Sequence, residues 1–195
     1  MRKFGGNLVK GCEGLVIGGS AGSLEVLLKV LPNLRTDMSF PIIVVVHRKQ
    51  GADFLLAELL SARTQLRVKE VEEKEEIMPK TIYIAPSDYH LLIEKEHTFS
   101  LDYSEKVNYS RPSIDVTFQS AAEVYTNKLA CLLLSGSNAD GVNGLQIVKN
   151  YNGLALAQEP STASVGYMPE QAILKVKIDR ILKPEDMADY INSLV

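Results

Sequence analysis

Three segments of this chain are runs of consecutive apolar residues with no polar alternation. They are Leu15–Ile17, Ile42–Val46 and Leu129–Leu134. A strand that is apolar at every position is buried on both faces, and such strands are typical of parallel sheets covered by helices. These runs therefore predict the central strands of an α/β fold.

Shorter apolar segments and helical periodicity complete an alternation of strands and helices. Strands are expected at 66–71, 81–84 and 154–158, and helices at 24–31, 53–60, 114–125, 142–149 and 184–194. The predicted fold class is a doubly wound α/β domain, with a mostly parallel sheet and helices on both faces. We expect residues 1–195 to form this single domain.

Two segments depart from the alternation. Residues 90–94 and 98–103 flank a short charged tip, which predicts an antiparallel hairpin, expected at one edge of the sheet. Residues 159–169 are rich in Ser, Thr and Pro and too polar for a core, so we expect them to drape over the carboxyl edge of the sheet.

Composition narrows the classes of function. The chain is 46% hydrophobic with a formal net charge of −3, which gives no reason to expect nucleic-acid binding. No apolar run is long enough to span a membrane, and residues 1–6 are not followed by the apolar stretch of a signal peptide. Cys12 and Cys131 are interpreted as reduced, partly buried residues rather than a disulfide. We therefore expect a cytoplasmic protein.

Polar residues follow three predicted strands where each strand ends. Ser20 follows the first, His47 the second, and residues 135–141, which include Asp140, follow the third apolar run. Ligands of open α/β sheets bind beyond the carboxyl ends of the strands. The pattern therefore brings a serine, a histidine and an aspartate toward one rim.

The turn around Ser20 reads Gly18-x-Ser20-x-Gly22, the pattern of a nucleophile elbow. In such an elbow the serine occupies a strained corner, and the next helix directs its N-terminal N–H groups at the reacting group. A phosphate or dinucleotide loop and a turn without chemistry are the alternatives. Gly-x-Gly-x-x-Gly and Gly-Lys-Ser/Thr are both absent, which weakens the first alternative, but the turn alone does not decide.

The remaining candidates also have structural explanations. His47 ends a buried strand, where a polar residue is unexpected unless it faces the rim; His90 is equally well explained as structural or as lining the cleft. Asp140 precedes a helix and either caps it or orients a histidine, two compatible roles. Asp115 is better explained by pairing with the dipole of its own helix. The histidines have no ligand-like spacing, so no metal site is predicted.

Six motifs occur in order along the chain: Ile17-Gly18-Gly19-Ser20-Ala21-Gly22-Ser23, Val46-His47, Ile84-Ala85-Pro86-Ser87-Asp88-Tyr89-His90, Arg111-Pro112-Ser113-Ile114-Asp115-Val116 with Phe118-Gln119-Ser120-Ala121-Ala122, Ser135-Gly136-Ser137-Asn138-Ala139-Asp140-Gly141, and Ala157-Gln158-Glu159 with Gly166-Tyr167-Met168-Pro169. Together, over about residues 15–179, they resemble the catalytic domain of the CheB family of chemotaxis protein-glutamate methylesterases.

The resemblance implies Ser20 as nucleophile, His47 as general base and acid, and Asp140 as the group that orients His47. The family hydrolyses glutamate γ-methyl esters on chemoreceptor helices, with some glutamine deamidation, and the resemblance calls for no cofactor. Backbone N–H groups at Ser137 and Ala21 are the expected oxyanion donors. His90 and Arg111, which lie in two of the motifs, are included as candidate substrate-binding residues.

Three positions depart from the family pattern. Ala21 and Ser23 replace a threonine and a glycine, and Ser137 replaces a methionine. We also expect the chain to act without the N-terminal receiver domain that is usual in the family. The implied partners are the cytoplasmic helices of methylated chemoreceptors and a separate response-regulator domain. The departures leave a second hypothesis open, a catalytically weakened docking module in a signalling assembly, and a nucleotide-binding domain is a third.

Overall fold

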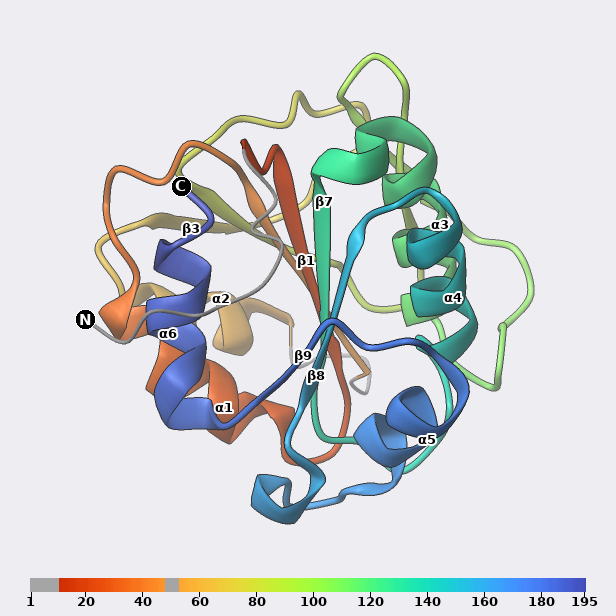
Figure 1. The fold of residues 1–195 in the computed structure, drawn as a ribbon. Helices are drawn as coiled ribbons and strands as arrows, with labels where there is room; N and C mark the ends of the chain where they lie inside the picture. Colours follow the sequence, from red (N-terminus) through yellow and green to blue (C-terminus); the bar gives the residue numbers. More distant parts are fainter. Residues whose placement is uncertain (1–10, 48–52) are drawn as a thin grey trace.

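The computed structural model describes residues 11–47 and 53–195, and within them a seven-stranded sheet runs through the molecule (Figure 1). Its order is β3-β4-β2-β1-β7-β8-β9, and every neighbouring pair is parallel. The strands are β1 (Gly14–Gly19), β2 (Ile42–Val46), β3 (Arg67–Glu70), β4 (Thr81–Ile84), β7 (Leu129–Leu133), β8 (Leu154–Gln158) and β9 (Arg180–Leu182). The predicted parallel sheet is confirmed.

Helices cover both faces of this sheet, as predicted. They are α1 (Ser23–Val30), α2 (Asp53–Ser61), α3 (Ile114–Tyr125), α4 (Val142–Asn150), α5 (Tyr167–Lys175) and α6 (Pro184–Asn192), with short 3₁₀ turns at Leu31–Asn33, Thr126–Lys128 and Pro160–Thr162. Figure 1 shows α1, α2 and α6 on one side and α3, α4 and α5 on the other. Each layer has its own apolar core.

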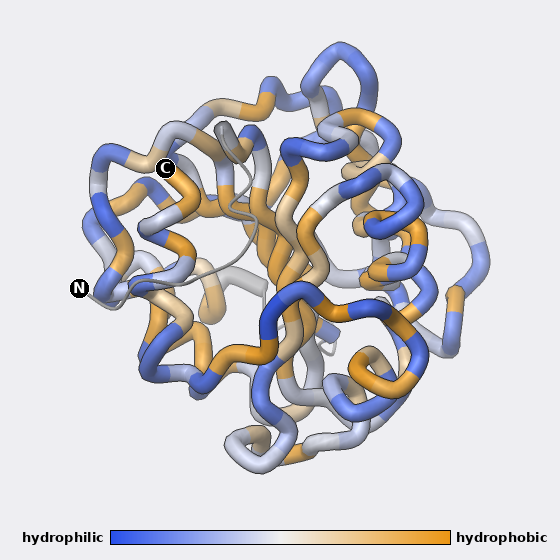
Figure 2. Tube along the Cα trace, in the orientation of Figure 1, coloured by the Kyte–Doolittle hydropathy of each residue, from blue (hydrophilic) through white to orange (hydrophobic). Residues whose placement is uncertain are grey.

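The continuous apolar strands supply both cores at once. Successive side chains of a strand point to opposite faces, so Leu15 and Ile17 enter the core under α1 while Val16 enters the core under α3. All three are at most 1% exposed. Figure 2 shows the same distribution, with hydrophobic strands at the centre and hydrophilic connections outside. Burial on both faces explains why these strands lack polar alternation.

The hairpin prediction is half right. Strands β5 (His90–Ile93) and β6 (Phe99–Asp102) pair antiparallel, but they form a separate two-stranded sheet, so the predicted place at an edge of the main sheet is wrong. The hairpin instead packs against α3. Thr117 Oγ1 donates to the Leu91 carbonyl (2.8 Å), and Ser120 Oγ accepts the Ile93 N–H (3.1 Å). Helix side chains thus meet backbone groups that an edge strand would offer to the sheet.

The segment after β8 is only partly as predicted. Residues 160–166 lie against the loop that follows β7, where Gly136 N–H donates to the Val165 carbonyl (3.0 Å). The chain then enters α5, which was not predicted, and continues to β9, also unpredicted. Only Met168, Pro169 and Ala172 are buried on α5, so its apolar periodicity is weak.

Both cysteines are free thiols, as predicted, and they are buried more completely than the partial burial expected. Burial raises the pKa of Cys12 to about 11, which keeps the thiol protonated and unreactive at neutral pH. Among the residues of the described ranges, no helix is long and apolar enough to cross a membrane. Residues 1–6, where a leader was predicted to be lacking, lie outside the described part of the chain.

Candidate active site

The candidate residues meet at the carboxyl ends of three neighbouring strands. Ser20 follows β1, His47 follows β2, and Asp140 ends the loop after β7. Backbone bonds tie the three connections together: His47 N–H donates to the Gly19 carbonyl (3.2 Å), and Ser20 N–H donates to the Ser135 carbonyl (2.9 Å). The strand order reverses between β1 and β7, which is where doubly wound sheets bind ligands.

The turn after β1 differs in one respect from a strained elbow. Among the described residues of this turn, positive φ occurs at Gly22 (φ 82°) and not at Ser20. A Cβ at Gly22 would lie 2.6 Å from Ser164 Cβ and 2.8 Å from Ser135 Oγ. That hydroxyl donates to the Ala21 carbonyl (2.6 Å), so Gly22 lets the turn close against two other loops.

Substituting Gly22 with alanine should therefore lower the free energy of unfolding by about 2–4 kcal/mol. About 1–2 kcal/mol comes from the left-handed backbone and the rest from crowding. Gly11 is a matched control, because its φ is 78° but a Cβ there meets nothing within 4 Å. Gly11→Ala should cost only the backbone part. Equal losses in urea unfolding would contradict the crowding at Gly22.

His47 and Asp140 form the central contact of the site. His47 Nε2 lies 2.8 Å from Asp140 Oδ2, and the Asp140 side chain is fully buried. A neutral imidazole that donates from Nε2 keeps its lone pair on Nδ1. Ser110 Oγ lies 3.5 Å from Nδ1, a long contact that leaves this nitrogen available as a base.

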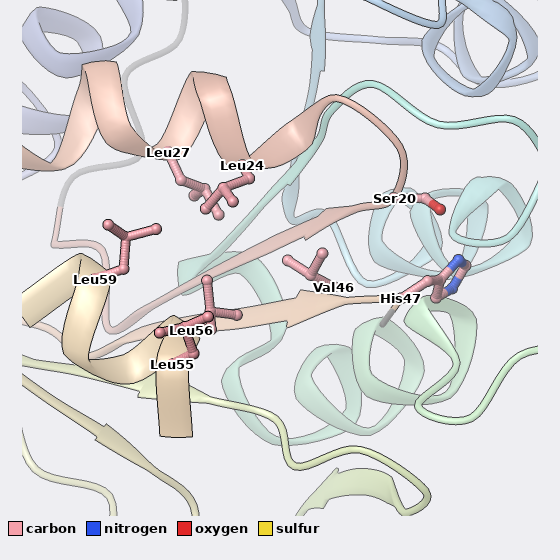
Figure 3. Close-up of a pocket in the computed structure, with 8 residues that line it drawn as sticks. All are labelled: Ser20, Leu24, Leu27, Val46, His47, Leu55, Leu56 and Leu59. Carbon is pink, nitrogen blue, oxygen red and sulfur yellow. The ribbon is translucent and has the colours of Figure 1, made fainter. Parts of the chain in front are cut away.

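Ser20 lies beside this imidazole. Ser20 and His47 line the same pocket, and Figure 3 shows both side chains beyond the ends of β1 and β2. Within residues 11–47 and 53–195 no hydrogen bond joins Ser20 Oγ to His47. Catalytic hydrogen bonds are often long in unliganded enzymes and tighten when substrate binds. The arrangement therefore has the parts of a serine nucleophile and its base.

Asp140 accepts hydrogen bonds from the N-terminal end of helix α3. Oδ1 accepts from Ser113 Oγ (2.8 Å) and the Asp115 N–H (3.2 Å), while Oδ2 accepts from the Ile114 N–H (2.7 Å) as well as from His47. Burial by itself raises the pKa of Asp140, but these hydrogen bonds outweigh it and hold the pKa below its ordinary value. The carboxylate is thus fixed in position and ionised.

The helix that Asp140 caps is α3, not the helix that follows it in sequence. Helix α4 begins after Gly141, and this N-cap residue supplies no side-chain hydrogen bond to the helix. Its Gly144 N–H donates to Asp115 Oδ1 (2.6 Å) instead. Asp140, before α4, therefore caps α3, and Asp115, on α3, caps α4. The expected cap of Asp140 on the helix that follows it is therefore wrong, while Asp115 lies in the first turn of α3 as expected and also caps α4.

The expected oxyanion donors lie at the open side of the site. Ala21 and Ser137 are both exposed. In the part of the chain that the structure describes, neither backbone N–H has a hydrogen-bond acceptor. Unused N–H groups at a helix start and a neighbouring loop are suited to binding a developing negative charge.

Comparison with known proteins gives the site its context. A family model for CheB methylesterase matches residues 15–191. The chain belongs to the CheB methylesterase family. A putative protein-glutamate methylesterase/protein-glutamine glutaminase of Leptospira interrogans is 44% identical over 182 residues, which cover 93% of this chain and 94% of that protein.

Relatives from Thermotoga maritima connect this member of the CheB family to a solved structure. A protein-glutamate methylesterase/protein-glutamine glutaminase is 36% identical over 93% of this chain, but the chain spans only 54% of its length. The crystal structure of the Thermotoga maritima CheB methylesterase catalytic domain matches with a TM-score of 0.91 at 36% identity, covering 94% of this chain and 98% of that one. The fold is therefore that of a CheB catalytic domain.

In this CheB-family domain, His90 and Arg111 do not face the Ser20 pocket. His90 is 1% exposed; its Nδ1 accepts the Ser113 N–H (3.2 Å), so Nε2 carries the proton that it donates to the Glu105 carbonyl (2.9 Å). Arg111 donates to the carbonyls of Tyr103 (3.1 Å) and Ser104 (2.7 Å). Both residues brace the loop before α3. Of the two explanations for His90, this geometry favours the structural one.

Three polar residues that complete the site were not identified from the sequence. Asn108 and Ser110 lie in the loop before α3, and Asn138 lies in the loop after β7. Ser110 contacts His47, and Asn108 Nδ2 bridges Asp115 Oδ2 (2.8 Å) and Asp140 Oδ1 (3.3 Å). Asn138 Oδ1 accepts the Asp140 N–H (3.1 Å). In the sequence they belong to polar loops with no periodicity, so only the motif containing Asn138 carried any signal.

Asp115 gives the domain a measurable pH dependence. Burial, together with the nearby Asp140 charge, raises its pKa to about 6 from an ordinary value of 3.8. Between these values the folded state holds a proton that the unfolded state lacks, so this stabilisation is present below pH 4 and is lost as the pH rises through 6. When the pH is lowered from 7 to 4.5, the free energy of unfolding of the wild type should rise by about 2 kcal/mol relative to that of Asp115→Asn, as measured by urea unfolding. Parallel pH curves would contradict the raised pKa.

Proposed function

We propose that this chain hydrolyses glutamate γ-methyl esters on chemoreceptor proteins and releases methanol, with deamidation of receptor glutamines as a second reaction. The names of its relatives describe these two activities. The observation that carries the proposal is the 2.8 Å contact between His47 and a buried, ionised Asp140, beside a serine on the same pocket.

In the proposed reaction His47 Nδ1 takes the proton of Ser20 Oγ as this oxygen attacks the γ-carbonyl carbon. Asp140 holds the imidazole by Nε2 and stabilises its positive charge. The carbon–methoxy bond then breaks, and Nδ1 gives its proton to the departing methoxide. Water, deprotonated by Nδ1, attacks the acyl-enzyme; the ester bond to Oγ breaks, and Ser20 recovers the proton. With a glutamine, the carbon–nitrogen bond would break in place of the carbon–methoxy bond, and Nδ1 would protonate the nitrogen that departs as ammonia.

The tetrahedral oxygen needs fixed donors while it carries negative charge. We assign this role to the backbone N–H groups of Ala21 and Ser137, each typically worth about 3 kcal/mol of transition-state stabilisation. Two departures from the family pattern are compatible with this role, since both residues act through the backbone. The third, Ser23, is buried, and its hydroxyl donates to the Ser20 carbonyl (2.7 Å), which supports the turn.

The proposed substrate also indicates the partners of this domain. We propose that residues 1–195 act as one catalytic domain on the cytoplasmic helices of methylated receptors, with a separate response-regulator domain as a further partner. The catalytically weakened docking module is the less favoured alternative. A scaffold would need Asp140 only as a cap of α3, and it has no chemical need for a histidine held by that carboxylate beside a serine.

Methanol release tests the proposal. Receptor carrying labelled methyl esters is incubated with the chain, and volatile label and free carboxylate are measured against time. Methanol in proportion to new carboxylate supports the esterase. A serine-directed phosphonate should also label Ser20, and this labelling should be lost in His47→Gln. Absence of both reactions would leave the docking module as the better account.

A further inference from the structure

An apolar pocket opens directly beside the proposed nucleophile. Its volume is about 260 Å³. Ser20 and His47 lie at one end, and the other described lining residues belong to α1, β2 and α2 (Figure 3). These lining residues are Leu24, Leu27, Val46, Leu55, Leu56 and Leu59. Among the described residues that line the pocket, all except Ser20 and His47 are aliphatic.

The reaction itself does not account for this pocket. The alcohol part of the proposed substrate is a single methyl group, and its acyl part is the short stem of a glutamate. The apolar surface also extends outside the pocket, because Leu55 is 69% and Leu24 36% exposed. Leucines that line a concave site and also reach solvent mark a surface that a ligand covers.

The position of the pocket identifies the ligand. Since Ser20 and His47 form part of the lining, a group seated there touches the reacting residues. A partner bound there permanently would block the ester, whereas the substrate must come to this place. A charged group would lose its hydration among the leucines, and none of the described aliphatic lining residues could pair with it. An aliphatic group of the substrate itself satisfies both conditions.

We propose, on the basis of the proposed function, that this pocket binds an aliphatic side chain of the substrate helix that neighbours the esterified glutamate. Side chains three or four residues apart are neighbours on the surface of a helix. An apolar groove that binds a helix contacts side chains at these spacings and one turn further along. The pocket would thus select, among receptor glutamates, those with a leucine-sized neighbour on the correct side.

Synthetic helical peptides test this selection. Each peptide carries one glutamyl methyl ester in an alanine-rich helix, and a single leucine is moved through the positions three, four and seven residues before and after it. The kcat/KM for methanol release is measured for each peptide. Leucine at one or two of these positions should raise kcat/KM by about 10- to 50-fold over the all-alanine peptide, from roughly fourfold per buried methylene.

Two variants connect the effect to the pocket. Leu55→Ser changes an exposed lining residue, so the fold is retained, and the preference for leucine should fall to a few-fold. Leu174→Ser is the matched control: Leu174 is 76% exposed on α5, outside the pocket lining, and the preference should persist.

The outcomes separate the two proposals. Equal kcat/KM for all peptides, or a leucine preference that survives in Leu55→Ser, would overturn the pocket assignment while the esterase remains. A dependence on Leu55 seen only with small esters of increasing chain length would likewise overturn it, because the occupant would then be an acyl chain. No methanol from any peptide or from methylated receptor would overturn the proposed function, and this inference with it.

Discussion

Replacement of Ser20 by alanine should abolish methanol release from methylated receptor, with a loss of about 10⁴-fold or more in kcat. Without Oγ no acyl-enzyme forms, and the oxyanion donors alone supply only residual catalysis. The fold should be unaffected. Ser20 is partly exposed, and its hydroxyl makes no hydrogen bond within the described ranges, so its removal leaves no buried group unpaired.

The measurement compares initial rates of methanol release with thermal unfolding of the same preparations. Ser161→Ala is a suitable control, since Ser161 is an exposed serine on the 3₁₀ turn after β8. It should retain both rate and stability. If Ser20→Ala kept the wild-type rate, the assignment of the nucleophile would be wrong, whatever the rest of the site looks like.

Asp140→Asn should damage both catalysis and stability. The amide cannot hold His47 in the tautomer whose lone pair is on Nδ1, and loss of that orientation typically lowers kcat by about 10³- to 10⁴-fold. Four groups of the described chain donate to this carboxylate from α3 and the loop before it, besides His47. In the amide one oxygen is replaced by an NH₂ group, which is a donor, so some of these four groups lose their acceptor. This loss should lower the free energy of unfolding by about 2–4 kcal/mol.

The pH dependence separates this variant from a simple packing defect. The pKa of Asp140 is held below its ordinary value of 3.8, so the stability that it contributes is present at neutral pH and is lost as the pH falls below about 4. Stability should therefore differ most between wild type and Asp140→Asn at neutral pH and converge in acid. Asp37→Asn, at an exposed carboxylate, should change neither property. Full activity in a folded Asp140→Asn protein would exclude the proposed role.

Much of this architecture follows from local patterns. The unbroken apolar runs at β1, β2 and β7 are typical of strands buried on both faces, and their carboxyl ends carry Ser20, His47 and the Asp140 loop. Because parallel strands end at one edge, the convergence of these three residues needs no tertiary information. The Gly18-x-Ser20-x-Gly22 pattern is also local, and it predicts the turn that leads from β1 into α1.

The rest depends on contacts between segments distant in sequence. Nothing near Asp140 reveals that its oxygens accept N–H groups from the first turn of α3, some 25 residues away along the chain. The hairpin packs on α3 through Thr117 and Ser120, two ordinary helix residues. His90 resembles a site residue in a motif, but its ring nitrogens are used by backbone groups. Polar residues in aperiodic loops become meaningful only when their partners are known.

The exchange of caps between α3 and α4 affects how inactive members of this family should be recognised. A descendant that had lost the esterase activity would still need a carboxylate at position 140 to hold two helices together. Retention of that aspartate is therefore no sign of a working enzyme. The Ser20 hydroxyl has no hydrogen bond within the described residues, so position 20 is where the loss of activity in a relative would first become visible.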